Sequence, residues 1–357
     1  MPDYLFVDQP DTLVSDLSGH AKFGVDTEFM REKTYFAELC LVQISAGTSI
    51  YCVDPLVDAG KENFWRQLLG ASWVLHSARQ DIEVVYQTAG AMPTEIFDTQ
   101  IAAGLLGMSA QVGYAGLVKE LFDVDMAKSH TRADWTRRPL SDAVLEYAAE
   151  DVEYLLPAAD TLSESLDKKG RLDWARQDSA LLLDPALYVV SGDQAIDRLK
   201  GARNFRGAKR AAAVRLAAWR ENEAIRRNRP RQWILRDSPL LDIAYKLPSS
   251  VEALSRIEGV PPKLVNRAGQ DIIDAVSASA RDANGYQPPQ PPDEAQKALL
   301  KEMQSKVAEC ARDLDLSAET VASKRELSAV VISGNRESRV FTGWRRDLIG
   351  EQLLGLL

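Results

Sequence analysis

Cysteine is scarce in this chain of 357 residues, which contains only Cys40, Cys52 and Cys310. An odd number of cysteines without a CxxC pair argues against a disulfide framework and against a structural zinc site. Histidine is scarce as well, with three residues. The few cysteines favour a reducing, cytoplasmic setting. The shortage of cysteine and histidine, the usual zinc ligands, argues against zinc-dependent chemistry.

Long apolar runs are also lacking. No stretch of about 18 consecutive apolar residues occurs, so no membrane span is expected. Residues 1–10 contain Asp3 and Asp8 but no basic residue, so no secretory signal is expected there. With 45% hydrophobic and 27% charged residues, the chain has the composition of an ordinary globular protein, and its length indicates two or three domains.

An overall excess of positive charge is missing, because the formal net charge is −9. One segment departs from this average: residues 198–236 contain thirteen arginines and lysines against only Glu221 and Glu223. A local excess of this kind attracts a phosphate backbone whatever the charge of the whole chain. The alternative is a solvated helix face. The residues predicted to contact nucleic acid are Arg206, Lys209, Arg210, Arg226, Arg227, Arg229 and Arg231.

Strand and helix patterns alternate over residues 1–190. This alternation predicts an α/β domain in which helices pack on a sheet. A bend at Pro157 is expected within the last and longest helix. The expected strands are 22–28, 37–44, 49–54, 73–76 and 96–98, and the expected helices are 77–89, 99–106 and 143–166.

Helical patterns fill the remainder of the chain. Residues 207–282 predict a small all-helical domain, in which Ser249 and Ser250 are the candidate caps of a short helix. A proline-rich linker follows, and residues 293–357 predict a third, helical domain that begins with Asp293 as a cap. No long apolar heptad seam is present, which favours a monomer.

Carboxylates occur in three short motifs of the α/β domain. Asp26 and Glu28 lie two apart on a strand and project from one face, with Thr27 turned away. Tyr147 and Asp151 lie four apart on a helix and share a face. Together with Asp81, these acids are predicted to converge around two divalent ions, because buried carboxylates are costly unless they are paired or bound to metal.

Magnesium is the ion that this oxygen-rich set favours, with Mn²⁺ as the alternative. Two such ions would stabilise both the attacking and the departing oxygen during cleavage of a phosphodiester bond. The tyrosine would orient the attacking water. The candidate catalytic residues are therefore Asp26, Glu28, Asp81, Tyr147 and Asp151, and the four carboxylates among them are the candidate metal ligands.

The motifs, taken in order, resemble those of the DEDD exonuclease superfamily in its tyrosine-bearing subgroup, and most closely the ribonuclease D family. The resemblance covers about half of the chain. In addition, residues 207–280 resemble an HRDC domain, a helical nucleic-acid-binding module, and residues 293–357 stand where that family carries a second, divergent HRDC-like domain. The motifs that carry the resemblance are Val25–Phe29, His76–Glu83, Phe97–Gln100, Ala133–Leu140 and Tyr147–Val152.

The resemblance implies a ribonuclease H-like core with a mixed sheet, followed by two all-α HRDC-type domains. It also implies a 3′→5′ exoribonuclease that trims the 3′ ends of structured RNAs such as tRNA precursors and releases 5′-mononucleotides. The implied partner is RNA with a free 3′ end. The implied domain boundaries are 1–190, 207–282 and 293–357.

Other side chains near the acidic motifs are predicted to contact the substrate. The basic ones could bind RNA phosphates or could instead pair with Asp125, Asp134 and Asp142. Phe29 could lie beside the terminal base. Asp98 is expected to cap the helix that follows it, and Trp135 is expected to anchor its loop in the core. The predicted substrate contacts are Thr27, Phe29, His76, Lys128, Arg132, Arg137 and Arg138.

Two other functions compete with this interpretation. A DNA-directed 3′→5′ exonuclease could use the same metal chemistry, but the HRDC-like block and the absence of a polymerase region disfavour it. A catalytically silent nucleic-acid-binding protein would use only the helical domains, and the intact set of five candidate catalytic residues disfavours that alternative.

Overall fold

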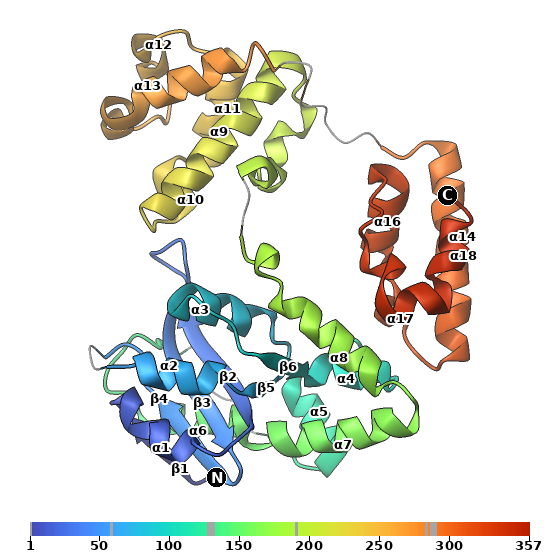
Figure 1. Ribbon diagram of the computed structural model, residues 1–357. Coiled ribbons are helices and arrows are strands. Elements are labelled where there is room, and N and C mark those ends of the chain that lie inside the picture. Colours follow the sequence, from blue (N-terminus) through green and yellow to red (C-terminus); the bar gives the residue numbers. More distant parts are fainter. Residues whose placement is uncertain (1, 58–59, 127–132, 190–191, 283–284, 286–290) are drawn as a thin grey trace. The chain divides into compact units, whose positions relative to one another are not determined.

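A computed structural model describes residues 2–57, 60–126, 133–189, 192–282, 285 and 291–357 (Figure 1). The chain forms two compact units. Unit 1 comprises Met1–Met30, Leu39–Asp184 and Pro292–Leu357. Unit 2 comprises Arg31–Glu38 and Pro185–Pro291.

A mixed six-stranded sheet forms the centre of unit 1, in the order β1-β4-β3-β2-β5-β6. Strand β3 pairs with β4 in the antiparallel direction, whereas β1 with β4, β2 with β5 and β5 with β6 pair in the parallel direction. The α/β expectation is confirmed, although the edge strand β1 was not predicted. The strands are β1 (Tyr4–Val7), β2 (Lys22–Met30), β3 (Glu38–Ala46), β4 (Ser49–Val53), β5 (Ser72–Leu75) and β6 (Glu95–Asp98).

Strand β2 lies inside the sheet, and its sequence explains why. Phe23, Gly24 and Val25 are buried, so the first half of the strand belongs to the core. From Asp26 onward the exposure increases, and the strand carries its acidic residues toward the edge of the packed region. A Cβ atom on Gly24 would lie 3.0 Å from the Cβ atom of Leu155, so this glycine allows the neighbouring helix to approach closely.

Helices pack on the sheet in unit 1. Helix α6 (Asp142–Glu153) packs against β2 and β4, α7 (Leu155–Lys168) against β2 and β5, and α3 (Arg79–Ala89) against β2. Helix α8 (Leu172–Ala180) packs against β6. The remaining helices of this part are α1 (Val14–Leu17), α2 (Glu62–Leu69), α4 (Thr99–Leu105) and α5 (Tyr114–Phe122), with a 3₁₀ turn at Pro10–Leu13. Of these helices, α1, α2, α5 and α8 were not predicted.

The expected helix over residues 143–166 is in fact two helices, and its expected bend at Pro157 is wrong. The break lies at Tyr154, between α6 and α7. Pro157 occupies the third position of α7. The amides of a first helical turn have no intrahelical acceptor, so a proline there removes no hydrogen bond.

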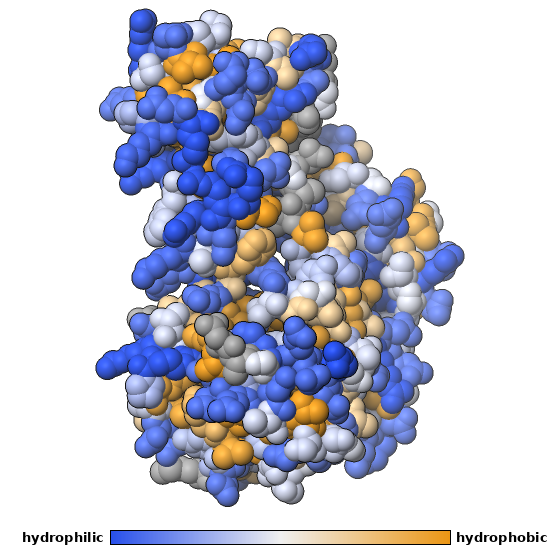
Figure 2. All heavy atoms as spheres, turned by 60° about the vertical axis from the view of Figure 1, so that its left-hand side comes forward, coloured by the Kyte–Doolittle hydropathy of each residue, from blue (hydrophilic) through white to orange (hydrophobic). Residues whose placement is uncertain are grey.

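Unit 2 is helical and has its own apolar core, which includes Leu216, Ile243, Leu254 and Ile272. Of the two candidate caps, Ser250 is the one that caps α12, by accepting a hydrogen bond from the amide of Ala253. Figure 2 shows a mostly hydrophilic surface on this unit, interrupted by small hydrophobic patches. Its helices are α9 (Gly207–Arg226), α10 (Arg231–Ile234), α11 (Asp237–Lys246), α12 (Val251–Ser255) and α13 (Pro262–Ala278), preceded by 3₁₀ segments at Pro185–Leu187, Gly192–Arg198 and Lys200–Asn204.

The C-terminal block, residues 292–357, has a small core of its own that includes Met303, Val307, Leu327 and Val330. It begins as expected at Asp293, which forms a capping box with Gln296. By its contacts this block belongs to unit 1. Its helices are α14 (Glu294–Asp313), α15 (Ala318–Val321), α16 (Lys324–Ser333), α17 (Gly343–Arg345) and α18 (Glu351–Leu354), with short 3₁₀ and π turns at Arg339–Phe341 and Arg346–Gly350.

The boundaries 1–190, 207–282 and 293–357 stay a prediction. Among the described residues, no helix combines the length and the apolar character that a transmembrane span requires.

Candidate active site

Three carboxylates meet where β2 faces α6. Ligand oxygens of Asp26, Glu28 and Asp151 all lie within 4.8 Å of one another, and all three side chains are partly exposed. Strand alternation places Asp26 and Glu28 on the same face of β2, and α6 packs against that strand. The structure therefore brings together three of the four predicted metal ligands.

The proximity of these carboxylates changes their protonation. Burial, followed by the charges of Asp151 and Asp81, raises the pKa of Glu28 to about 8. Burial also raises the pKa of Asp151 to about 7, although a hydrogen bond from Tyr147 acts in the opposite direction. The pKa of Asp26 is raised well above its ordinary value by burial and by the surrounding acids. Without a cation, the folded protein thus favours protons on these groups.

Asp81 approaches the same region from α3 but lies outside the group of three. Its side chain is buried, with 7% exposure, and accepts a 2.6 Å hydrogen bond from the hydroxyl of Thr27. Burial raises the pKa of Asp81 to about 7, against the lowering effect of that hydrogen bond. The charge of Asp81 contributes to the raised pKa of both Asp26 and Glu28, which places it electrostatically within the site.

Thr27 is turned away from Asp26 and Glu28, as the strand pattern predicts, and it is buried. Its hydroxyl holds Asp81, so this side chain positions an acid of the site. The predicted contact of Thr27 with the substrate stays a prediction for its backbone.

Tyr147 lies one helical turn before Asp151 on α6 and is hydrogen-bonded to it. Burial and the charges of Asp151 and Glu28 raise the pKa of the Tyr147 phenol. Its ring lies 6.4 Å from that of Trp135, centroid to centroid. Trp135 is 4% exposed within the core, which confirms that it anchors its loop.

A divalent cation fits this donor set. Hard cations such as Mg²⁺ prefer carboxylate oxygens, and three carboxylates with oxygens within 4.8 Å of one another supply them. A cation would also offset the mutual repulsion that raises the pKa values. Asp26, Glu28 and Asp151 would hold it, and Asp81 lies near enough to interact with the same acids.

The guanidinium of Arg138 is hydrogen-bonded within the protein, and its predicted contact with an RNA phosphate stays a prediction. Its guanidinium donates from Nη2 to Oδ1 of Asp54 at 2.8 Å and to the carbonyl of Cys40 at 2.7 Å. It also donates from Nη1 to the carbonyls of Trp135 and Arg137. The partner is therefore Asp54, which the sequence analysis did not consider, and Arg138 ties the loop before α6 to the sheet.

The other residues predicted to contact the substrate differ in their exposure to solvent. Arg137 is exposed, and Phe29 is half-buried just beyond the acids of β2. His76 is half-buried, with Nδ1 2.9 Å from the Thr99 hydroxyl and Nε2 2.9 Å from the Val112 carbonyl. Both ring nitrogens are thus engaged within the protein. Lys128 and Arg132 lie outside the described residues.

The basic segment of unit 2 contains both internal and surface cations. Arg210 is buried, and its Nη1 donates to the carbonyl of Ala202; its predicted contact with nucleic acid stays a prediction. Arg231 pairs with the buried Glu221, and Lys209 lies 3.4 Å above the ring of Tyr245. Arg226 is exposed and pairs with Glu223. Arg206, Arg227 and Arg229 are exposed.

The sequence analysis missed Arg267, which lies on α13. Burial and the neighbouring charges of Arg227 and Arg226 lower the pKa of Arg267. Arginines that repel one another at a surface form a suitable site for an anion such as a phosphate. Arg267 lies outside the basic run of residues 198–236, so only the fold brings it to the others.

Comparisons with known proteins agree with this architecture. Residues 7–167 match the family model described as 3′-5′ exonuclease, and residues 209–276 match the HRDC domain. The chain is 37% identical to ribonuclease D of Gluconacetobacter diazotrophicus over 347 residues, covering 93% of this chain and 86% of that protein. It is 34% identical to ribonuclease D of Xanthomonas oryzae pv. oryzae, covering 94% and 93% of the two chains. The chain belongs to the ribonuclease D family.

A solved structure supports the same assignment. The crystal structure of Escherichia coli RNase D, an exoribonuclease involved in structured RNA processing, superposes with a TM-score of 0.88 at 27% identity over 99% of this chain and 98% of that one. The catalytic core of RRP6 from Trypanosoma brucei superposes with a TM-score of 0.59 at 26% identity, over 79% and 81%. The protein is accordingly a 3′-5′ exoribonuclease, a hydrolase that acts on RNA and uses divalent metal.

Proposed function

We propose that this exoribonuclease trims the 3′ ends of structured RNAs, tRNA precursors among them, by two-metal-ion hydrolysis that releases 5′-mononucleotides. The observation that carries this proposal is the meeting of Asp26, Glu28 and Asp151 within 4.8 Å. Support for a structured substrate comes from the Escherichia coli relative, an exoribonuclease involved in structured RNA processing.

In this proposal Asp26, Glu28 and Asp151 hold one Mg²⁺, and Asp26 with Asp81 holds a second. Bound Mg²⁺ would lower the pKa of a water molecule and neutralise charge on the oxygens that attack and leave. A bound cation would relieve the repulsion among the acids that raises their pKa values, and it would displace the protons that the metal-free site favours.

Tyr147 orients the attacking water and does not act as a base. Its raised pKa keeps the phenol protonated at neutral pH, so the hydroxyl donates or accepts a hydrogen bond without losing its proton. Its hydrogen bond with Asp151 fixes the side chain beside the carboxylates. Phe29, the residue after Glu28 on β2, is proposed to contact the terminal base, and the exposed Arg137 is proposed to contact phosphate.

Unit 2 is proposed to bind the body of the RNA. Arg227, Arg229 and Arg267 are exposed on this unit and offer cations to the RNA backbone. Contacts with phosphates give affinity without dependence on sequence, which suits a substrate recognised by its 3′ end. A cytoplasmic location, supported by three free cysteines, and a monomeric state complete the proposal.

A comparison of matched RNA and DNA oligonucleotides tests this function. With Mg²⁺ present, the parent protein should release mononucleotides from the 3′ end of RNA, and much less from DNA. Asp26→Asn should lower kcat by at least roughly 100-fold, because removing even an outer partner of a metal ligand costs 10–100-fold. Asp167→Asn, an identical change at an exposed position of α7, should have no effect.

Two outcomes would overturn the proposal. Equal or faster release from DNA would favour a DNA-directed exonuclease. Tight RNA binding by the parent protein with no Mg²⁺-dependent release of mononucleotides would favour a silent RNA-binding protein.

A further inference from the structure

Asp98 hydrogen-bonds the turn that precedes helix α3. This carboxylate, at the end of β6, caps α4 as expected by accepting from the amides of Gln100 and Ile101. The same carboxylate accepts from the amide of Ala78 at 2.8 Å and from that of Ser77 at 3.2 Å. Asp98 is 2% exposed, so these bonds are shielded from water. One buried carboxylate therefore binds the starts of two helices.

The second of these helices carries Asp81. Ala78 is the N-cap residue of α3 and provides no side-chain cap, so Asp98 supplies the acceptor from a neighbouring strand. Ser77 has a φ of 60°, which is unfavourable for a residue other than glycine. A conformation of this kind persists only when its surroundings hold it. The direction in which α3 presents Asp81 thus depends on the bonds that Asp98 makes.

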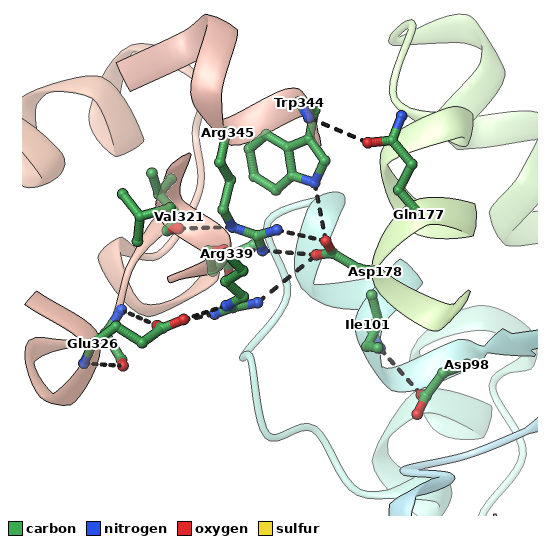
Figure 3. Close-up of polar contacts among 12 residues, drawn as sticks. Asp98, Ile101, Gln177, Asp178, Val321, Glu326, Arg339, Trp344 and Arg345 are labelled. Atoms are coloured by element: carbon green, nitrogen blue, oxygen red, sulfur yellow. Dashed lines mark hydrogen bonds and ion pairs between the residues drawn. The ribbon is translucent and has the colours of Figure 1, made fainter. Parts of the chain in front are cut away.

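Asp98 is in turn held by α8. The hydroxyl of Ser179 accepts a 3.0 Å hydrogen bond from the backbone amide of Asp98, and Ser179 is fully buried. The adjacent residue on α8, Asp178, belongs to a different contact. Its carboxylate faces the C-terminal block, as Figure 3 shows.

Asp178 and Arg345 form a buried ion pair with exposures of 6% and 2% for their side chains. Nη2 of Arg345 donates to Oδ2 of Asp178 at 2.7 Å, and Nε1 of Trp344 donates to Oδ1 of Asp178 at 3.1 Å. The same guanidinium donates to the carbonyls of Val321 and Thr320 at 2.8 and 2.9 Å (Figure 3). Arg345 therefore joins α15 and α17 to α8 through one planar group.

Apolar and polar contacts accompany this ion pair. The rings of Trp344 and Trp174 stack with centroids 4.4 Å apart and planes 5° apart. Arg171 donates to the carbonyl of Leu105 at 2.9 Å and to that of Leu314 at 2.7 Å. The C-terminal block is thus packed against the exonuclease core by Trp174 of α8 and by Arg171, the residue that precedes α8.

We propose that Asp98 is a positioning residue for Asp81, and that the C-terminal block holds Asp98 in place through Asp178 and Ser179 of α8. The contacts run from Arg345 to Asp178, along α8 to Ser179, across to Asp98, and on to the turn at Ser77 and Ala78. The block then contributes to catalysis without touching substrate. This inference rests on the proposed function in one respect, namely that Asp81 acts in the metal site.

Three variants of the protein each remove one contact of the series that runs from Arg345 to the turn at Ser77 and Ala78. Asp98→Asn removes an acceptor, Ser179→Ala removes the hydroxyl, and Arg345→Lys removes the planar fork of donors. The control is Arg346→Lys, the same change at the next residue, whose partner Glu351 is 59% exposed and whose own side chain is 58% exposed.

Hydrogen exchange of the amides of Ser77 and Ala78 is the first measurement. We expect faster exchange in all three variants and no change in the control. The second measurement is turnover of a short RNA oligonucleotide. We expect kcat to fall and the Mg²⁺ concentration for half-maximal rate to rise, each by roughly tenfold, as is typical when an outer partner of a metal ligand is lost. KM should stay unchanged.

A purely structural role for the block predicts a different result. Arg345→Lys would then lower the melting temperature while exchange at Ser77 and Ala78, kcat and the Mg²⁺ requirement stayed at parental values, and this outcome would overturn the proposal. Should Arg345→Lys fail to fold, Ser179→Ala decides in its place, because it removes one hydroxyl only. Asp81→Asn separates the two proposals: parental activity in that variant refutes the role of Asp81, whereas the exchange measurement still tests the contact chain.

Discussion

The acids of the active site are kept close together against their mutual repulsion. Burial and neighbouring charge raise the pKa of Glu28 to about 8 and burial raises those of Asp81 and Asp151 to about 7. A carboxyl whose pKa is raised by folding stabilises the fold below its unfolded pKa, and that stabilisation is lost as pH rises through the folded pKa. Each unit of upward shift removes about 1.4 kcal/mol once pH exceeds both values.

At the scale of single residues we therefore predict that the metal-free protein becomes less stable as pH rises from about 5 to about 8. Asp26→Asn should flatten this dependence and raise the melting temperature at the higher pH, because one of the mutually repelling charges is removed. Mg²⁺ should stabilise the parent protein more at the higher pH than at the lower, since protons compete for the same oxygens. Thermal unfolding in EDTA and in Mg²⁺ measures both effects.

Asp167→Asn is the matched control, and its melting temperature should follow the parental curve. If the stability of the metal-free protein increased over this pH interval, the pKa values of these carboxyls would not be raised by folding, and the prediction would be contradicted.

Single residues also show what sequence reasoning could reach. The acids of β2, α3 and α6 were identified because motif and strand or helix period place them on known faces. The internal partners of Arg138 and Arg210 were not predicted, because a charge count does not say which side of an element faces inward. Their partners, Asp54 and the carbonyl of Ala202, are set by tertiary packing.

At the scale of elements, the break between α6 and α7 matters for the site. The amide of Tyr154 donates a 2.9 Å hydrogen bond to the hydroxyl of Tyr114, on α5. The break therefore depends on a side chain about 40 positions earlier in the sequence, which explains why local sequence pointed to Pro157 instead. Edge strand β1 was missed for a similar reason, since it is defined by parallel pairing with the distant β4.

Tyr114→Phe tests the importance of this bond. Removing the hydroxyl leaves the amide of Tyr154 without its acceptor, and an unsatisfied buried donor costs about 1–3 kcal/mol. We expect a loss of stability of this size in denaturant unfolding, together with lower kcat, because α6 carries Tyr147 and Asp151.

The control for this change is Tyr245→Phe, where the side chain is 56% exposed on unit 2. Its stability and kcat should equal those of the parent. Equal stability of Tyr114→Phe and the parent would show that the helix break is held by other contacts.

At the scale of the whole molecule, the division into parts depends on contacts that leave no local pattern. Residues 293–357 were expected as a separate helical domain, and they do have a core of their own. Nevertheless, Trp344 lies within an apolar cluster made with Leu105, Leu162 and Ala175 of the exonuclease part. One tryptophan and one arginine in a short helix gave no sequence signal of this packing.

The charge of the whole molecule likewise hides its binding surface. Although the net charge is −9, we predict that RNA affinity falls steeply with salt, because contacts with phosphates release counterions. In an Asp26→Asn background, which prevents degradation, Arg227→Gln and Arg267→Gln should each reduce the slope of log affinity against log salt by roughly 0.7–0.9, the value for one lost phosphate contact. Fluorescence anisotropy with a structured RNA at several salt concentrations measures the slope. Arg176→Gln, an exposed arginine of α8 that pairs with Asp173, should leave it unchanged. Equal slopes for all three variants would mean that the arginines of unit 2 do not contact the RNA backbone.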